Sequence, residues 1–433
     1  MTLFGSPWRF ISGAFAGGAL VGVVLALLGA APFAAEDDED AVAPTARLAR
    51  DDEADTAKPS CPDVVPVAAP WAPGERAAAP LALPRASRRF ERRVRFWGDV
   101  WGTHPSHVYV FFDERRPSVV HGTVDCRDLF EGAPEEVAEP RCDRRLAKKR
   151  RDIKQRLYRE RRRPSRKTLR AFDPSRKVAK QLARTAHQNV RVIEGRADKV
   201  KEASERATPH LARLEAIFAT AGVPKELARL AYVESLFHPR AVSRSGAVGA
   251  YQFMAPTGRL WLTIEDGVDE RLDPERAGWA AARYLRQLHD RFKSWPLALT
   301  AYNTGPTRLR RLMRRHRTRD LDRIVRSLRE ERGFGFDGQN YYASFVGMIR
   351  ATKDTEPPEE AERRETVKLT CARALAELAA CLSTTTDALA AVNPALEASV
   401  VEGKQPVPEG HFLTLPPGDG AATGADDSSG EGA

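Results

Sequence analysis

A helical period of apolar and polar positions dominates the middle of the chain. From about residue 203 to residue 353, apolar side chains recur at i, i+3 and i+4, as at Leu227, Leu230 and Ala231. This spacing is typical of amphipathic helices, and no regular alternation of strands and helices interrupts it. Two glycine-bearing loops, SRSGAVGAYQF and AYNTGP, separate the helical segments. We therefore predict a mainly α protein with a compact α-rich domain at residues 203–353.

Three further segments with different patterns flank this domain. Residues 86–142 start with a basic, aromatic-bearing helical pattern and continue with HVYVFF and SVVHGTV around the turn DERRP, which predicts a β-hairpin in a small α+β region. Residues 143–202 are strongly basic and are predicted to be helical. Residues 365–417 contain two strand-like stretches, ETVKLT and HFLTLP, on either side of two short helices, which predicts a β-α-α-β unit.

The N-terminal segment has the pattern of a membrane or export signal. A run without charged residues extends from Phe10 to Ala35, between Arg9 and a cluster of acids. Such a run can span a bilayer or serve as a secretory signal, so we predict that residues 1–35 are one of the two. The charge asymmetry predicts that the rest of the chain lies outside the cytoplasm, in the cell envelope or periplasm.

Two segments have compositions that are typical of disorder. Residues 36–85 are rich in Ala, Pro and acids, and residues 418–433 consist almost wholly of Gly, Ala, Ser, Thr and acids. Segments with so little apolar periodicity cannot bury enough surface to offset the entropy of ordering the chain. We predict a disordered linker and a disordered tail.

The excess positive charge of the protein is local. The chain has 69 Lys and Arg against 59 Asp and Glu, which gives a net charge of +10. Residues 144–167 alone contain 14 Lys or Arg against Asp152 and Glu160. Because the tract has no interleaved aromatics beyond Tyr158 and the protein is predicted to be exported, we expect no nucleic-acid partner. A solvated helix, or contact with an anionic envelope polymer or with lipid headgroups at a membrane, is favoured instead.

The five cysteines suit an exported protein in which disulfides can form. Two local pairs are plausible, Cys126 with Cys142 and Cys371 with Cys381, which leaves Cys61 unpaired. No Cys or His spacing matches a metal site, so we expect no metal and no cofactor.

One carboxylate occupies an unusual position. Glu234 falls at i+7 on the apolar face that begins at Leu227. A buried carboxyl group keeps its proton to higher pH and can donate it to a leaving-group oxygen. The alternative is a carboxylate that reaches solvent at the end of its helix, near His238. The face pattern alone leaves both interpretations open.

Three ordered motifs carry a family resemblance. Glu234-Ser235, then SRSGAVGAYQFMAPTGR, then AYNTG resemble the lytic transglycosylases of the soluble lytic transglycosylase family, closest to the membrane-bound lytic murein transglycosylase D type. The resemblance covers about residues 203–352 and implies a lysozyme-like helical fold with peptidoglycan glycan strands as substrate. It implies that Glu234 is the catalytic acid and base. The implied cleft residues are Ser235, Ser243, Gly246, Gly249, Gln252, Met254, Tyr302, Asn303 and Tyr342, the last from the looser motif QNYYASF.

The resemblance also implies the reaction. Glu234 would protonate the β-1,4 glycosidic oxygen between MurNAc and GlcNAc and then deprotonate the muramic acid 6-hydroxyl, leaving a 1,6-anhydro end. A goose-type lysozyme that uses water, and an inactive glycan-binding protein, remain as alternatives. Residues 365–417 resemble a LysM unit but lack the usual G-D-T after the first strand. Glycan binding and a purely packing role therefore both stay open for this unit.

Overall fold

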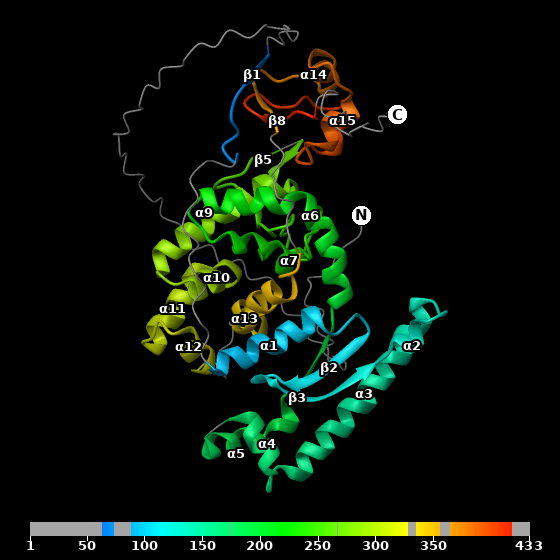
Figure 1. The fold of residues 1–433 in the computed structure, drawn as a ribbon, viewed down its shortest axis with the longest axis vertical. Coiled ribbons are helices and arrows are strands. Elements are labelled where there is room, and N and C mark those ends of the chain that lie inside the picture. The colour runs from blue at the N-terminus through cyan, green and yellow to red at the C-terminus, as the bar shows by residue number, and fades with distance from the viewer. Residues whose placement is uncertain are drawn as a thin grey trace, which may run out of the picture. The chain divides into compact units, whose positions relative to one another are not determined.

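A computed structural model describes residues 63–72, 88–173, 175–265, 267–327, 335–355 and 364–417 (Figure 1). The predicted signal or anchor at residues 1–35 and the predicted tail at residues 418–433 lie outside these ranges. Within them the chain is mainly α, as predicted, with two three-stranded sheets and one two-stranded sheet. No helix in the described ranges combines the length and apolar character needed to cross a membrane.

The N-terminal region contains the predicted helix and hairpin. Helix α1 (Arg88–Gly102) precedes strands β2 (Val108–Asp113) and β3 (Arg116–Asp125), which pair antiparallel. The elements that follow are α2 (Arg127–Phe130), α3 (Glu135–Glu160), α4 (Arg166–Phe172), α5 (Arg176–Arg184), the 3₁₀ turn η1 (Ala186–Gln188) and β4 (Val190–Glu194). The sheet order is β3-β2-β4. The hairpin is therefore confirmed, but it is part of a larger sheet.

Strand β4 corrects the prediction that residues 143–202 are helical throughout. The segment VRVIE is rich in β-branched residues, and its Val190 and Val192 are buried. It pairs antiparallel with β2, with Tyr109 opposite Glu194. The paired residues are 77 to 85 positions apart in sequence, so local periodicity could not reveal the pairing.

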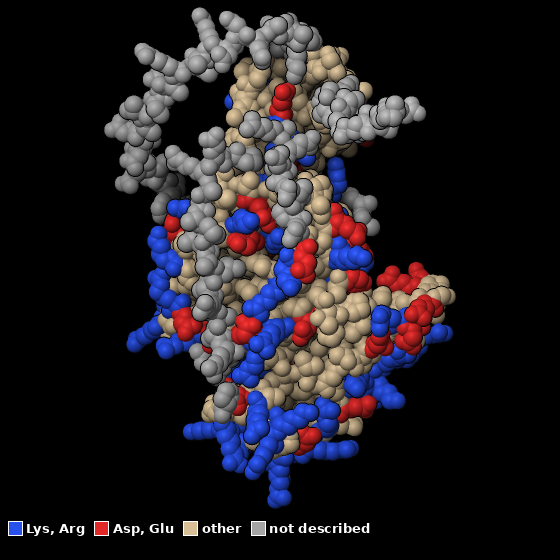
Figure 2. Space-filling view, viewed as in Figure 1, with Lys and Arg blue, Asp and Glu red and all other residues tan. Residues whose placement is uncertain are grey.

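Helix α3 separates an apolar face from a basic one. Its buried residues are Ala138, Cys142, Leu146, Ile153 and Leu157. The predicted Cys126–Cys142 disulfide is confirmed and ties this helix to the end of β3. In Figure 2, Lys and Arg side chains gather over the surface where Figure 1 draws α3, α4 and α5. The basic tract is thus the solvated side of a packed helix and of the two helices that follow it.

The central domain is built from helices around one hydrophobic core. Its elements are α6 (Ala197–Thr220), η2 (Lys225–Arg229), α7 (Leu230–Ser235), α8 (Ala255–Gly258), β5 (Ile264–Glu265), β6 (Val268–Asp269), η3 (Glu270–Leu272), α9 (Pro274–Phe292), α10 (Trp295–Thr304), α11 (Pro306–His316), α12 (Leu321–Ser327) and α13 (Phe336–Ala351). Asp273 caps α9 by accepting from the amides of Glu275 and Arg276. The core includes α1, so this helix belongs with the central domain.

Helix α1 packs closely along α13, although the two are far apart in sequence. The indole N–H of Trp101 donates to the Ser344 hydroxyl at 3.0 Å, and that of Trp97 donates to the Asn340 side-chain oxygen at 3.4 Å. Gly98 and Gly347 lie against each other at the same helix contact. A Cβ on Gly347 would lie 2.7 Å from the Gly98 backbone nitrogen, so the two helices are in backbone contact.

The C-terminal unit has the two predicted strands with helices between them, but it has three short helices where two were predicted, and it gains a strand. Its elements are β7 (Thr366–Leu369), α14 (Leu375–Cys381), α15 (Thr386–Ala391), α16 (Ala398–Val401) and β8 (Phe412–Thr414), with β1 (Val64–Pro66) in the sheet order β1-β7-β8. Residues 63–72, predicted to belong to a disordered linker, therefore fold against this unit. The sequence missed this because a three-residue strand has no periodicity of its own.

The predicted Cys371–Cys381 disulfide is wrong. Cys371 is a free thiol, and its sulfur donates to the Asp63 carboxylate at 3.3 Å. The prediction rested on short spacing along the chain, whereas disulfides depend on the distance and direction of the side chains.

The contact between α1 and α13 predicts that alanine substitutions at Gly347 and Gly98 have different effects on stability. Gly347→Ala places a methyl group against the α1 backbone, and we expect it to lower the free energy of unfolding by about 1–3 kcal/mol. Gly98→Ala is the matched control, because its Cβ would meet only the Gly347 carbonyl oxygen, at 3.9 Å. Better helix propensity makes Gly98→Ala neutral or slightly stabilising. Urea unfolding of both variants checks the difference, and equal stability would contradict the close contact.

Candidate functional site

Glu234 lies in the last turn of α7, at a tightly fixed helix end. The next two residues, Leu236 and Phe237, both adopt left-handed backbone conformations, which non-glycine residues rarely do. Their amides donate to the carbonyls of Tyr232 and Ala231, and this ends the helix. Phe237 is buried and packs against the Tyr232 ring. The position of the Glu234 backbone is thus set by a strained turn that buried aromatic packing stabilises.

The carboxyl group of Glu234 is enclosed by tyrosines and lacks a counter-charge. The Tyr341 hydroxyl, on α13, donates to Glu234 Oε1. Within the described part of the chain, Glu234 forms no ion pair. Burial raises the pKa of Glu234 to about 7, and the hydrogen bond from Tyr341 opposes that rise. The predicted apolar-face position therefore yields a carboxyl group that exchanges its proton near neutral pH.

Tyr302 completes the aromatic surroundings of this group. Its ring is half-buried on α10, and its hydroxyl donates to the Tyr251 carbonyl at 2.9 Å. Burial and the nearby Glu234 carboxylate raise the pKa of Tyr302 well above its usual value, so it stays a neutral phenol. Tyr251 is fully buried and donates to the Ala228 carbonyl, on the turn before α7. These contacts link α10 and the Tyr251 loop to the helix that carries Glu234.

Three of the predicted cleft residues, Ser235, Gly249 and Gln252, contact the protein backbone in or beside the loop before Met254. Ser235 donates to the Ala250 carbonyl at 2.9 Å, and Gln252 donates its amide to the Gly249 carbonyl at 2.9 Å. Gly249 has a φ of +84°, and a Cβ there would lie 1.8 Å from the Arg271 carbonyl oxygen. This glycine makes room for the protein backbone at Arg271, whereas the family resemblance implied that it lines the glycan cleft. All three residues shape the loop that faces the end of α7.

Four other predicted residues are accessible. Gly246 has open space around its Cα, and Met254 is 41% exposed. Ser243 is partly exposed and shapes the turn, since its hydroxyl accepts from the Ala247 amide. Asn303 is exposed at the end of α10 and makes no hydrogen bond to another described residue. These side chains and this glycine are available to a ligand.

Tyr342, another predicted cleft residue, packs against α1 and not against Glu234. Its ring packs against Phe90 of α1, with centroids 5.2 Å apart. The neighbouring Tyr341 occupies the place at the carboxyl group. Adjacent helical residues point about 100° apart, so an offset of one residue is decisive here. The sequence signal was the pair of tyrosines, and only the packing of α13 on α1 selects between them.

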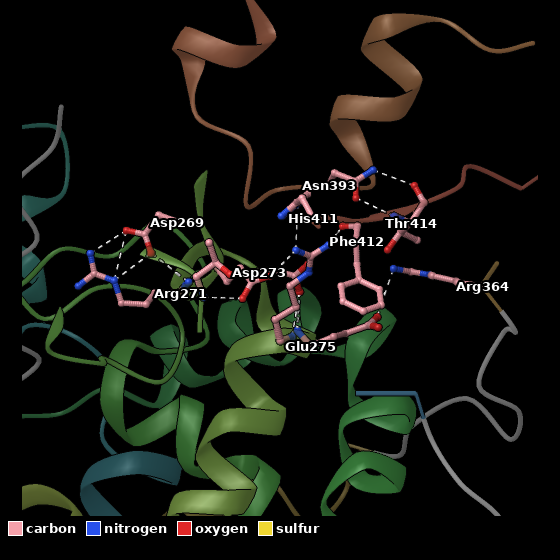
Figure 3. Close-up of polar contacts among 12 residues, drawn as sticks. Asp269, Arg271, Asp273, Glu275, Arg364, Asn393, His411, Phe412 and Thr414 are labelled. Atoms are coloured by element: carbon pink, nitrogen blue, oxygen red, sulfur yellow. Dashed lines mark hydrogen bonds and ion pairs between the residues drawn. The ribbon is translucent and has the colours of Figure 1, made fainter. Parts of the chain in front are cut away.

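The other buried carboxylates near this loop are all neutralised by arginines. They cluster at residues 269–275, and Figure 3 shows several of these pairs. The pairs are Asp269 with Arg271 at 2.7 Å, Glu270 and Asp273 with Arg276 at 2.7 and 3.3 Å, and Glu275 with Arg213 and Arg364 at 3.0 and 3.2 Å. Such pairs fix the carboxylates as structural groups. Glu234 is thus chemically distinct from them.

In the described ranges, no group of three or more His, Cys, Asp or Glu side chains is placed to hold a metal ion. What the site offers instead is a proton donor of suitable pKa, a phenol that contacts it and accessible amide and thioether groups. This arrangement suits acid–base chemistry on an uncharged substrate.

Comparison with known proteins assigns the central segment. The family model for the transglycosylase SLT domain matches residues 215–325. Residues 215–325 are therefore similar to a transglycosylase SLT domain, and this segment is called the SLT domain below. The SLT domain contains Glu234, the Gly246–Met254 loop and Asn303, whereas Tyr341 lies beyond its matched end.

Similar proteins carry related names over the same part of the chain. The membrane-bound lytic murein transglycosylase D of Escherichia coli (strain K12) is 31% identical over 116 residues, which is 26% of this chain and 26% of that protein. A membrane-bound lytic murein transglycosylase F of Alkalilimnicola ehrlichii is 40% identical over 104 residues, 22% of each. The peptidoglycan transglycosylase gp16 of Escherichia phage T7 is 44% identical over 92 residues, 20% of this chain and 7% of that protein. The chain thus spans about a quarter or less of these relatives.

The solved structure of the 70 kDa soluble lytic transglycosylase of Escherichia coli aligns over 63% of this chain and 52% of that one. The TM-score is 0.28 with 16% identity, which is too weak to add to the assignment.

The hydrogen bond from Tyr341 predicts a shift in pH dependence. Tyr341→Phe removes a donor that favours the charged form of Glu234, so the pKa of Glu234 should rise further above 7. If Glu234 acts as an acid, the fall of the rate at high pH should move to higher pH. The rate at pH 7 should still drop by about tenfold, because the carboxylate that forms in the reaction loses its hydrogen-bond donor. Tyr342→Phe is the control and should leave the profile unchanged. Identical profiles for all three proteins would contradict the role of this contact.

Proposed function

We propose that this protein is a peptidoglycan lytic transglycosylase that cleaves the MurNAc–GlcNAc β-1,4 bond and leaves 1,6-anhydromuramic acid ends. The single observation that carries the proposal is the half-buried carboxyl group of Glu234, which has no ion-pair partner among the described residues and a pKa of about 7, inside the segment that matches the transglycosylase SLT domain. The names of the relatives support the same substrate, since they refer to murein or peptidoglycan.

The first step uses Glu234 as an acid. Its proton passes to the glycosidic oxygen as the bond from that oxygen to C1 of MurNAc breaks, and the GlcNAc end leaves as an alcohol. A pKa near 7 keeps a large fraction of the group protonated at neutral pH while leaving it acidic enough to donate. The Tyr341 hydroxyl stabilises the carboxylate that results, because it already donates to Oε1.

The second step uses the same group as a base. The Glu234 carboxylate removes the proton of the MurNAc 6-hydroxyl as that oxygen forms a bond to C1, which regenerates the acid and closes the 1,6-anhydro ring. Ordinary glycosidases place a second carboxylate beside the sugar. Here the candidates at residues 269–275 are engaged by arginines. An internal hydroxyl nucleophile removes the need for a second carboxylate, which favours this reaction over hydrolysis.

We assign the substrate contacts to the accessible residues of the site. Asn303 and Met254, with Gly246 and Ser243, would contact the glycan directly. Ser235, Gly249 and Gln252 would act by shaping the loop, and Tyr302 by lining the wall beside Glu234. The site requires no cofactor for this chemistry, and its partner is the peptidoglycan strand.

Glu234→Gln is the decisive variant for the chemistry. An amide cannot donate and then accept the proton, so release of 1,6-anhydro products from purified peptidoglycan should fall by about 10²- to 10⁴-fold or more. Mass spectrometry of the products checks this and separates the alternatives. Hydrated reducing ends from the unmutated protein would indicate a lysozyme, and no cleavage at all would indicate a binding protein. Glu226→Gln, at the start of the same helical run, is the control and should be fully active.

The same variant should gain stability, with a pH dependence of known sign. Because the pKa of Glu234 is raised from 4.5 to about 7 on folding, the folded state binds this proton more tightly than the unfolded chain. The contribution of this proton to the stability of the folded state is fully present below pH 4.5 and is lost as the pH rises through 7. Glu234→Gln should therefore be more stable than the unmutated protein at pH 8, by at most about 3 kcal/mol, and nearly equal at pH 4.5. A melting temperature that falls at pH 8 would contradict an uncompensated carboxylate.

We propose that the enzyme is exported and works in the cell envelope, with residues 1–35 as its export signal or membrane tether. Two relatives are named membrane-bound, which supports an envelope location. A reporter active only in the cytoplasm, fused after Asp55, should be inactive, and an outside-active reporter at the same position should be active. The opposite result would place the catalytic domain in the cytoplasm and contradict export.

A further inference from the structure

A cavity of about 260 Å³ lies between the SLT domain and the C-terminal unit. The SLT domain contributes Trp261 and Trp279 to its wall, residues 63–72 contribute Trp71, and the C-terminal unit contributes Glu409, His411 and Phe412. It shares no residue with the site around Glu234. A site near the lower end of ordinary ligand-pocket volumes suits one sugar ring better than a large ligand.

The walls of this cavity are fixed by a fully buried arginine. Arg276 of α9 pairs with Glu270 at 2.7 Å and donates to His411 Nε2 at 3.1 Å and to the Phe412 carbonyl. Because arginine can only donate, His411 Nε2 accepts, and the proton of the neutral ring is on Nδ1. The Arg276 guanidinium also lies 4.4 Å from the centre of the Trp71 ring. Figure 3 shows His411 and Phe412 next to Asp273 at this junction.

Backbone contacts hold the two units in the same relation. The Asp269 amide donates to the Ala395 carbonyl at 2.8 Å, and the Glu397 amide donates to the Gly267 carbonyl at 2.9 Å. Val268 is part of the hydrophobic core of the C-terminal unit. The cavity is therefore preformed in the folded chain, so a ligand would not have to order it.

The chemistry of the lining selects a neutral, hydroxyl-bearing ligand. Half-buried Trp261 and Trp279 offer flat apolar surfaces of the kind that pack on the C–H faces of a sugar ring. Exposed Glu265 and Glu409 make no ion pair with any described residue, so their oxygens can accept hydrogen bonds from hydroxyl or amide N–H groups. The same carboxylates repel anions, which disfavours the carboxylates of a stem peptide.

We propose that this cavity is a second glycan site that binds an N-acetylglucosamine unit of the peptidoglycan strand. The proposal rests on the proposed function for its source of ligand. A site in the same compact unit as Glu234 would raise the local concentration of strand at the catalytic cleft. It also gives the C-terminal unit a glycan contact that is shared with the SLT domain.

Fluorine NMR on the full chain labelled with 5-fluorotryptophan tests the proposal site by site. The probe is N,N′,N″-triacetylchitotriose, and single Trp→Phe variants assign the signals. In Glu234→Gln protein, which cannot turn over substrate, the signals of Trp261 and Trp279 should shift on titration. Those of Trp97 and Trp101, buried in α1, should not. Unchanged Trp261 and Trp279 signals up to roughly 10 mM ligand, beyond which binding has no functional weight, would overturn the proposal.

A matched pair of glutamates then tests the contact. Glu409→Ala should weaken the titration of the Trp279 signal by about tenfold, because a charged acceptor is lost. Glu402→Ala removes an exposed glutamate of the same unit away from the cavity and should change nothing. Equal affinities in the two variants would overturn the assignment of Glu409. Shifts caused by a free stem peptide but not by chitotriose would overturn the sugar assignment.

The experiments distinguish failure of the second glycan site from failure of the proposed transglycosylase activity. Binding in the cavity is measured without turnover, so it can hold even if no 1,6-anhydro product is formed. Conversely, Glu409→Ala should keep the cleavage of short soluble glycans, since Glu409 does not touch the Glu234 site.

Discussion

The structure around the site depends on one partly buried carboxyl group, that of Glu234, which has no counter-charge among the described residues. Placing Glu234 among Tyr302, Tyr341 and the apolar face of α7 raises its pKa to about 7, which makes the charged form costly above that pH. An arginine close by would remove the cost and with it the proton donor. No described cation forms an ion pair with Glu234. The arginines that pair with residues 269–275 are each engaged by a carboxylate.

The geometry around that group depends on chain segments outside the SLT domain. Tyr341 is on α13, after the matched residues 215–325, and α13 is set by its packing on α1, long before them. Close contact at Gly98 and Gly347, with indole hydrogen bonds on both sides, leaves α13 little freedom to rotate or slide. A rotation by one residue would exchange Tyr341 for Tyr342. The N-terminal helix is thus part of the catalytic domain in physical terms, although the family match does not include it.

The sequence predicted the elements with local signals and missed those set by distant partners. Glu234 was singled out because a helical period placed a charge on an apolar face. Strand β4, β1 and the choice of Tyr341 over Tyr342 depend on partners far away in the chain. Gly249 was recognised as required, but the reason differed: its neighbour is the Arg271 carbonyl oxygen. Local patterns thus identified which residues matter more often than what they contact.

Arg276, at the junction with the C-terminal unit, links the cavity wall to the carboxylates of residues 269–275. Arg276 is fully buried, and its guanidinium pairs with Glu270 and Asp273 and contacts His411 and the Phe412 carbonyl. A buried cation held by several partners adds little net stability, but those partners constrain its geometry. Since Glu270 also accepts from the Thr263 amide, the loop after Met254 is tied to the same network. The wall of the cavity and the loop opposite Glu234 are therefore parts of one hydrogen-bonded frame. Neutralising the carboxylates of residues 269–275 keeps Glu234 the lone acid and at the same time gives the second cavity its rigid wall.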